Sequence, residues 1–88
     1  MLTGKTKSGF VYCIPESRLD NMELLDALVG IDKGDGTQLP RAVDLLLGSE
    51  MKQKLYDHLR TEHGNVPVKE TAAELLEIMQ GGQQAKNS

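Results

Sequence analysis

Alternating hydrophobic and polar residues near the N-terminus predict a short β-hairpin over residues 1–14. Phe10, Tyr12 and Ile14 occupy every second position of a segment rich in strand-forming residues, and Pro15 ends it. Side chains at this spacing lie on one face of a strand, so we expect these three in the core. A lone hairpin is marginally stable, so this one must pack on helices or add to another chain's sheet.

Beyond the hairpin, hydrophobic residues recur at steps of three and four, which is the spacing of amphipathic helices. The pattern predicts four helices, over 20–31, 39–47, 49–62 and 67–80. Asp20 has Glu23 three residues later, the spacing of a capping box at the start of the first helix. Gly48 separates the second helix from the third, Ser49 is the next N-cap, and Gly64 is a C-terminal stop.

The C-terminal residues differ in composition from the rest of the chain. Gly81-Gly82 is expected to end the last helix, and residues 82–88 contain few hydrophobic side chains, which predicts a disordered tail. Residues 1–81 then form a single small domain. The predicted fold class is α+β and mainly helical, with a short N-terminal β-hairpin or strand followed by a compact bundle of about four helices.

The composition favours a binding or assembly module over an enzyme. An 88-residue chain supports one small domain, and its three aromatic residues leave most of the core to aliphatic side chains. Deep substrate clefts usually need a larger scaffold. We therefore expect no catalytic residues and no cofactor.

Charge and hydropathy exclude two classes of partner. The net charge is −3 and the basic residues are scattered among acids, whereas nucleic-acid binding needs a basic surface. No hydrophobic run approaches the roughly 20 residues of a membrane span. The single cysteine, Cys13, favours a reducing compartment, so a cytoplasmic location is expected. We interpret Cys13 itself as a small hydrophobic residue of the strand.

The candidate metal ligands do not form a known motif. An EF-hand loop starting at Asp32 would need oxygen ligands where Gly34 and Val43 stand. His58 and His63 are five residues apart, which places them on different sides of a helix. The sequence therefore predicts no metal site.

Hydrophobic residues in excess of a small core are candidates for a partner-facing or oligomeric surface. Met22, Met51 and Met79 suit such a surface, because methionine adapts to varied partners. The partner-binding candidates on the last two helices are Leu55, Tyr56, Leu59, Leu75 and Met79.

Four stretches, in this order and spacing, resemble the tail assembly chaperones of long-tailed, siphovirus-type phages and prophages of Gram-positive bacteria. They are Met22-Glu23-Leu24-Leu25-Asp26-Ala27-Leu28, Leu45-Leu46-Leu47-Gly48, Leu55-Tyr56-Asp57-His58-Leu59 and Gly64-Asn65-Val66-Pro67. The resemblance extends from Ser8-Gly9-Phe10 to the last helix. Val11 and Cys13 depart from it, because polar or acidic residues are expected there.

The resemblance implies a non-enzymatic chaperone that binds the tape measure protein and keeps it soluble while tail tube subunits assemble around it. Its partners would be the tape measure protein and the tail tube protein, and self-association stays open. It would act in the cytoplasm of the host bacterium and be absent from the virion. Such chaperones are often also made as a longer frameshifted product, and Ala85-Lys86-Asn87 is compatible with a slippery codon heptamer.

Two alternatives remain from the sequence. One is a structural subunit of the phage tail, such as a completion protein retained in the virion. The other is a helix-turn-helix regulator that reads DNA with residues 49–62, although Glu50, Asp57 and Glu62 would repel phosphate groups.

Overall fold

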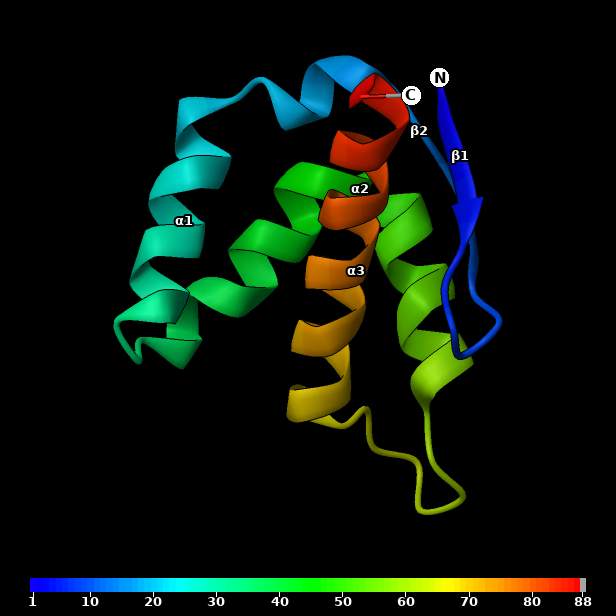
Figure 1. Cartoon of the computed structure of the whole chain (residues 1–88). Helices are drawn as coiled ribbons and strands as arrows, with labels where there is room; N and C mark the ends of the chain where they lie inside the picture. The colour runs from blue at the N-terminus through cyan, green and yellow to red at the C-terminus, as the bar shows by residue number, and fades with distance from the viewer. Residues whose placement is uncertain (88) are drawn as a thin grey trace.

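The computed structural model consists of an antiparallel hairpin beside three helices (Figure 1), described over residues 1–87 and, for side chains, over residues 1–81. The elements in chain order are β1 (Leu2–Lys5), β2 (Val11–Ile14), η1 (Glu16–Leu19), α1 (Met22–Asp32), η2 (Gly36–Gln38), α2 (Leu39–Leu59) and α3 (Val68–Asn87). The first half of α2 passes behind α3, and its second half runs beside the hairpin (Figure 1). The predicted class, α+β and mainly helical with an N-terminal hairpin, is confirmed.

The hairpin buries the face that the alternating pattern predicts. Phe10, Tyr12 and Ile14 are all buried. β1 pairs with β2 in a register that sets Thr3 opposite Cys13. Our interpretation of Cys13 as a packed hydrophobic residue is wrong, because it alternates with Tyr12 and Ile14 and therefore lies on the exposed face.

The first long helix is capped one residue later than the sequence suggests. Asn21 has extended backbone angles, and its side-chain oxygen accepts a hydrogen bond from the Glu23 amide at 3.0 Å. Asp20 instead follows η1 and donates its backbone amide to Ser17. Asparagine and aspartate cap helices about equally well, so the pattern could not choose between them.

A kink at Gly48 divides α2 into the two helical segments that the sequence predicts. Gly48 has φ 78° and ψ 163°, a conformation open almost exclusively to glycine. A Cβ at this position would lie 2.9 Å from Nη2 of Arg18. Within the described residues, the buried Nη1 of that arginine has no hydrogen-bond partner. The kink lets the two halves of α2 pack against different elements.

The second half of α2 ends at Leu59, three residues before the predicted end. Polar side chains of the next turn bind each other instead of continuing the helix: Arg60 donates to the Gly64 carbonyl, and the Thr61 hydroxyl donates to Asn65. Such local bonds compete with helical hydrogen bonding. Gly64 therefore belongs to this turn and is not the helix stop.

The last helix continues past its predicted end. α3 runs to Asn87, through Gly81 and Gly82. Glycine weakens a helix by only about 1 kcal/mol and does not by itself end one. At Gly81 there is a packing reason for it, because a Cβ there would lie 2.8 Å from the Tyr12 hydroxyl. The sequence also predicts a disordered tail over residues 82–88. The side chains of these residues, and Ser88 as a whole, lie outside the described residues.

The core lies where the hairpin, α1 and α3 meet α2. It is almost wholly aliphatic, as the composition predicts. Its buried members are Leu2, Phe10, Tyr12, Ile14, Leu24, Ala27, Leu39, Ala42, Val43, Leu46, Leu47, Leu55, Leu75 and Ile78.

Candidate binding groove

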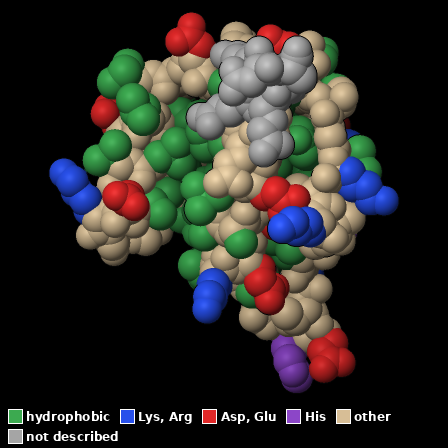
Figure 2. Space-filling model, in the orientation of Figure 1, with side chains coloured by type: hydrophobic (Ala, Val, Ile, Leu, Met, Phe, Trp, Pro, Cys, Tyr) green, Lys and Arg blue, Asp and Glu red, His purple; other side chains and the backbone are tan. Residues whose placement is uncertain are grey.

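An open hydrophobic hollow lies between α1 and α3, with the start of α2 as its floor. Its volume is about 320 Å³, and we call it the α1/α3 groove. Its hydrophobic lining is formed by Leu28, Ile31, Leu39, Leu75, Leu76 and Met79. Figure 2 shows hydrophobic side chains gathered in this hollow on the surface of the molecule.

The groove continues along α1 toward η1. A second hollow there is lined by Leu19, Leu24 and Leu25, and it shares Leu28 and Met79 with the first. The two hollows therefore adjoin each other at these side chains, and we include both in the α1/α3 groove. It extends along the whole of α1, whose 11 residues span about 16 Å at 1.5 Å per residue.

Helix α1 is hydrophobic on more of its circumference than the core requires. Leu24 and Ala27 are buried against α2, whereas Met22 is 66%, Leu25 50% and Val29 44% exposed. A helix that is hydrophobic on all sides is normally buried on all sides. α1 instead stands at the edge of the molecule (Figure 1), and the exposed Met22, Leu25 and Val29 show that part of its hydrophobic surface is uncovered.

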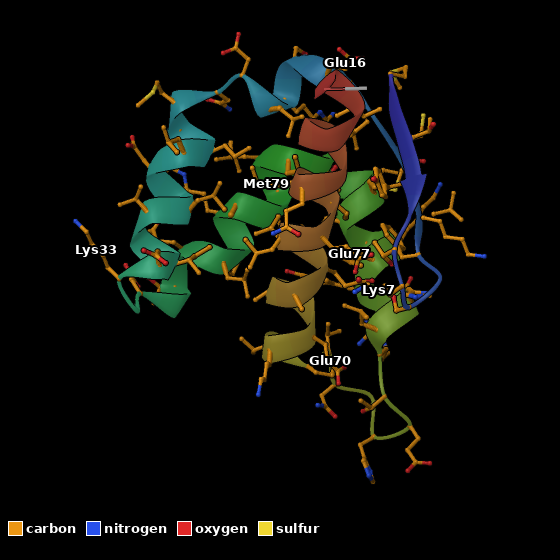
Figure 3. All side chains as sticks on the ribbon, in the orientation of Figure 1. Lys7, Glu16, Lys33, Glu70, Glu77 and Met79 are labelled. Carbon is orange, nitrogen blue, oxygen red and sulfur yellow. The ribbon has the colours of Figure 1, made fainter. Side chains whose placement is uncertain are left out.

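Helix α3 adds one exposed side chain to the opposite wall. Leu76 is 54% exposed, although its neighbour Leu75 is buried. Met79 is half-buried in the space between the two helices, and Figure 3 places it near the middle of α3. The groove therefore has hydrophobic walls on both sides.

A separate polar cluster fastens the hairpin tip to α2 and α3. Glu74 is buried, and its Oε1 accepts hydrogen bonds from the hydroxyls of Thr6 at 2.9 Å and Ser8 at 2.5 Å. The Ser8 hydroxyl also lies 3.1 Å from Nε2 of His58. On the far side of the turn, the Lys7 amide donates to Glu77 at 2.7 Å (Figure 3).

The Ser8–His58 contact is within the range of a nucleophile and its base, but the hydroxyl proton is directed elsewhere. Ser8 donates to the carboxylate of Glu74, so His58 faces a lone pair of the hydroxyl oxygen and acts as a donor. General-base activation requires the opposite arrangement, with the hydroxyl donating to the imidazole. The cluster of Thr6, Ser8, His58 and Glu74 therefore holds the hairpin tip in place, and we call it the hairpin clasp.

A third hollow, polar in lining, lies at the kink of α2. Cys13, Arg18 and Lys54 line it. His58 instead contacts Ser8 and the Phe10 ring, with ring centroids 5.6 Å apart. The structure thus places the cysteine and this histidine in different surroundings.

One exposed carboxyl group has a shifted pKa. Hydrogen bonds from the Thr37 hydroxyl, and then from the Thr37 amide, lower the pKa of Asp35. These bonds hold the turn before η2 at one end of the groove. They provide a local cap without forming a binding site.

The five partner-binding candidates of the sequence lie in different places. Leu75 and Met79 line the α1/α3 groove. Tyr56 lines another hollow, next to Pro40 and Val68, and Leu59 is half-buried against the core. Leu55 is 0% exposed, so its selection as a surface residue is corrected: it belongs to the hydrophobic core.

The main groove residues missed by the sequence interpretation are Leu25 and Leu76. Met22 was selected correctly as a surface methionine, since it is exposed beside the groove. A signal was present in α1, where seven of eleven residues are hydrophobic and exceed a single stripe. Which of them stay uncovered depends on how α3 packs, and this information is absent from the helical pattern.

No family model, curated protein or solved structure matches the chain. Among the described residues, no helix is both long and hydrophobic enough to cross a membrane. Over the same part of the chain, histidine, cysteine and acidic side chains form no group of three that could hold a metal ion.

Proposed function

We propose that this protein is a non-enzymatic assembly chaperone that holds hydrophobic helical segments of a partner protein in the α1/α3 groove. The observation that carries this proposal is the hydrophobic α1/α3 groove, which runs along the uncovered side of α1. Its length corresponds to about three helical turns, and helices commonly bind such grooves through side chains spaced three and four residues apart.

The partner we propose is the tape measure protein of a siphovirus-type phage or prophage, held until tail tube subunits replace the chaperone. The four stretches that resemble tail assembly chaperones support this choice. One of them, Met22–Leu28, forms most of the α1 wall of the groove. On this proposal the protein works in the host cytoplasm and is left out of the virion.

The energetics of the groove suit reversible binding. Met22, Leu25 and Leu76 are about half exposed, and covering each contributes about 1 kcal/mol. The resulting total of about 3 kcal/mol is close to the lower estimates of the free-energy cost of association. One chaperone therefore binds weakly and leaves readily, and the long partner is covered only while many copies are bound along it.

Co-expression with the tape measure protein, followed by size-exclusion chromatography with light scattering, tests the proposal. We expect a soluble complex with many copies of this chain per tape measure chain. The variant Leu25→Asp/Leu76→Asp places a charge on each groove wall and should leave the tape measure protein insoluble. The matched control is Val11→Asp/Val68→Asp, which changes two exposed hydrophobic side chains outside the groove and should keep the complex.

Two results would contradict the proposal. If the tape measure protein precipitates while the unmodified chain elutes alone, the chain is not a sufficient chaperone. If the control loses the complex and the groove variant keeps it, the binding surface lies elsewhere.

A structural tail subunit is the second candidate, and one observation favours it. The outward face of the hairpin exposes Val11 and Met1, which suits a contact between neighbouring subunits. Purified phage particles distinguish the two functions, because a structural subunit is retained in them and a chaperone is not.

A further inference from the structure

Acidic side chains stand at both ends of the α1/α3 groove. Asp20 lines the end beside η1, and Asp32 lines the end beside η2. Both are exposed, and the ion pairs found among residues 1–81 involve other acids. Among residues 1–81, the charged side chains that line the groove are therefore Asp20 and Asp32, and neither forms an ion pair.

Within residues 1–81, no cation forms an ion pair with either carboxylate, and the guanidinium of Arg18, two residues before Asp20, lies against Gly48. Lys33 follows Asp32 directly, but its side chain points outward, away from α3 (Figure 3). Arg41 is already paired with Glu23 at 2.8 Å.

The position of Asp32 also favours a cation from outside. It lies in the last turn of α1, at the negative end of the helix dipole, where a carboxylate is disfavoured. A positive charge bound beside it would relieve this repulsion. Among the residues up to Gly81, the α3 wall of the groove adds Gln80 as its one polar side chain.

A second copy of this chain is a poor occupant of the groove. Its own most hydrophobic exposed helix is α1, which would bring Asp20 and Asp32 of that copy against the same carboxylates. Like charges at short range repel, and each chain has a net charge of −3. The charge pattern therefore favours a different protein with basic side chains.

The geometry also sets the spacing of those basic side chains. Helix α1 starts two residues after Asp20 and ends at Asp32, and its length of about 16 Å is close to the rise of 11 residues in an antiparallel or parallel partner helix. Residues i and i+11 lie on nearly the same side of a helix. Two cations at this spacing can reach both ends of the groove at once.

We propose that the groove binds a basic amphipathic helix of the partner protein, with Lys or Arg at positions i and i+11, at the two ends of its hydrophobic stripe. The inference rests on the proposed function and adds the sequence character of the bound segment. Asp20 and Asp32 select such segments, while the hydrophobic walls contribute affinity for any helix.

Two synthetic peptides test this selection by fluorescence anisotropy with the full chain. They share one hydrophobic stripe and carry either Lys or Glu at positions i and i+11. Exposed ion pairs favour binding by roughly 2- to 5-fold each, so with two such pairs the Lys peptide should bind about 4- to 25-fold more tightly at low salt. Near 1 M salt, where the screening length is about 3 Å, this preference should largely disappear.

The variant Asp20→Asn/Asp32→Asn should remove the preference at low salt, because it keeps side-chain shape and removes both charges. The control Glu50→Gln/Glu62→Gln removes two exposed carboxylates outside the groove and should retain the preference. Equal binding of both peptides to the unmodified chain would overturn the charge selection and leave the proposed function standing. Binding of neither peptide would overturn the proposed function and this inference with it.

Discussion

Replacing Gly48 by alanine tests whether the kink in α2 is a requirement of the fold. The kink directs the first half of α2 behind α3 and the second half beside the hairpin (Figure 1), and Leu39 at the start of α2 lines the groove. Gly48 holds φ 78° and ψ 163°, and a residue with a Cβ adopts such a conformation at a cost of about 1–3 kcal/mol. The added methyl group would also meet the Arg18 guanidinium, 3.0 Å from its Cζ.

We expect Gly48→Ala to lower the free energy of unfolding by about 3 kcal/mol, combining backbone strain with displacement of the arginine. For a domain of this size, that change lowers the melting temperature by about 12–24 °C. Thermal and urea unfolding followed by circular dichroism measure it.

Gly64→Ala is the matched control for this variant. Gly64 also has a positive φ, 88°, but no atom lies within 4 Å of an added Cβ. It should therefore lose only about 1–2 kcal/mol. If Gly48→Ala were no more destabilising than Gly64→Ala, or if it stabilised the protein, α2 would not need its kink and our account of the groove floor would be wrong.

Two further predictions concern the polar contacts. Glu74→Ala removes the buried acceptor of the Thr6 and Ser8 hydroxyls and should lower the free energy of unfolding in urea by about 1–3 kcal/mol. The control Glu77→Ala removes an exposed contact to a backbone amide and should lower it by less than about 1 kcal/mol. Equal losses would contradict the role of Glu74 in the hairpin clasp. Thr37→Val removes the hydroxyl donor to Asp35 and should raise the pKa of that carboxyl toward its ordinary value in an NMR titration. Because folding lowers this pKa, the contact stabilises the fold above the unfolded pKa, and the stabilisation is lost as the pH falls through the folded pKa. An unchanged Asp35 pKa in the valine variant would show that the Thr37 hydroxyl does not cause the shift.

Local patterns predicted the elements of this fold well where one rule acts alone. The alternation of Phe10, Tyr12 and Ile14 identified the buried face of the hairpin, because a period of two allows one assignment. Gly48 identified the break in α2, since its neighbours on both sides form helix readily. The prediction failed where two rules compete, as at Gly81, which weakens a helix but fits under the Tyr12 hydroxyl.

The groove was harder to predict than the elements that form it. Leu55 and Leu76 are both leucines of helical stripes, yet one is fully buried and the other is half exposed. The way in which α3 packs against α2 and stays apart from α1 decides which of these leucines is buried and which is exposed. The surplus of hydrophobic residues in α1 was visible in the sequence, but the side on which they remain uncovered was not.

The four methionines allow the most direct test of groove binding. Met22 and Met79 line the groove, whereas Met1 is exposed at the hairpin and Met51 lines the hollow at the kink. We would label their methyl groups with carbon-13 and titrate the protein with the Lys-bearing amphipathic peptide. Our account predicts that the signals of Met22 and Met79 shift together while those of Met1 and Met51 stay in place. Shifts confined to Met1 or Met51, or no shift at all, would contradict the claim that the α1/α3 groove is the binding site.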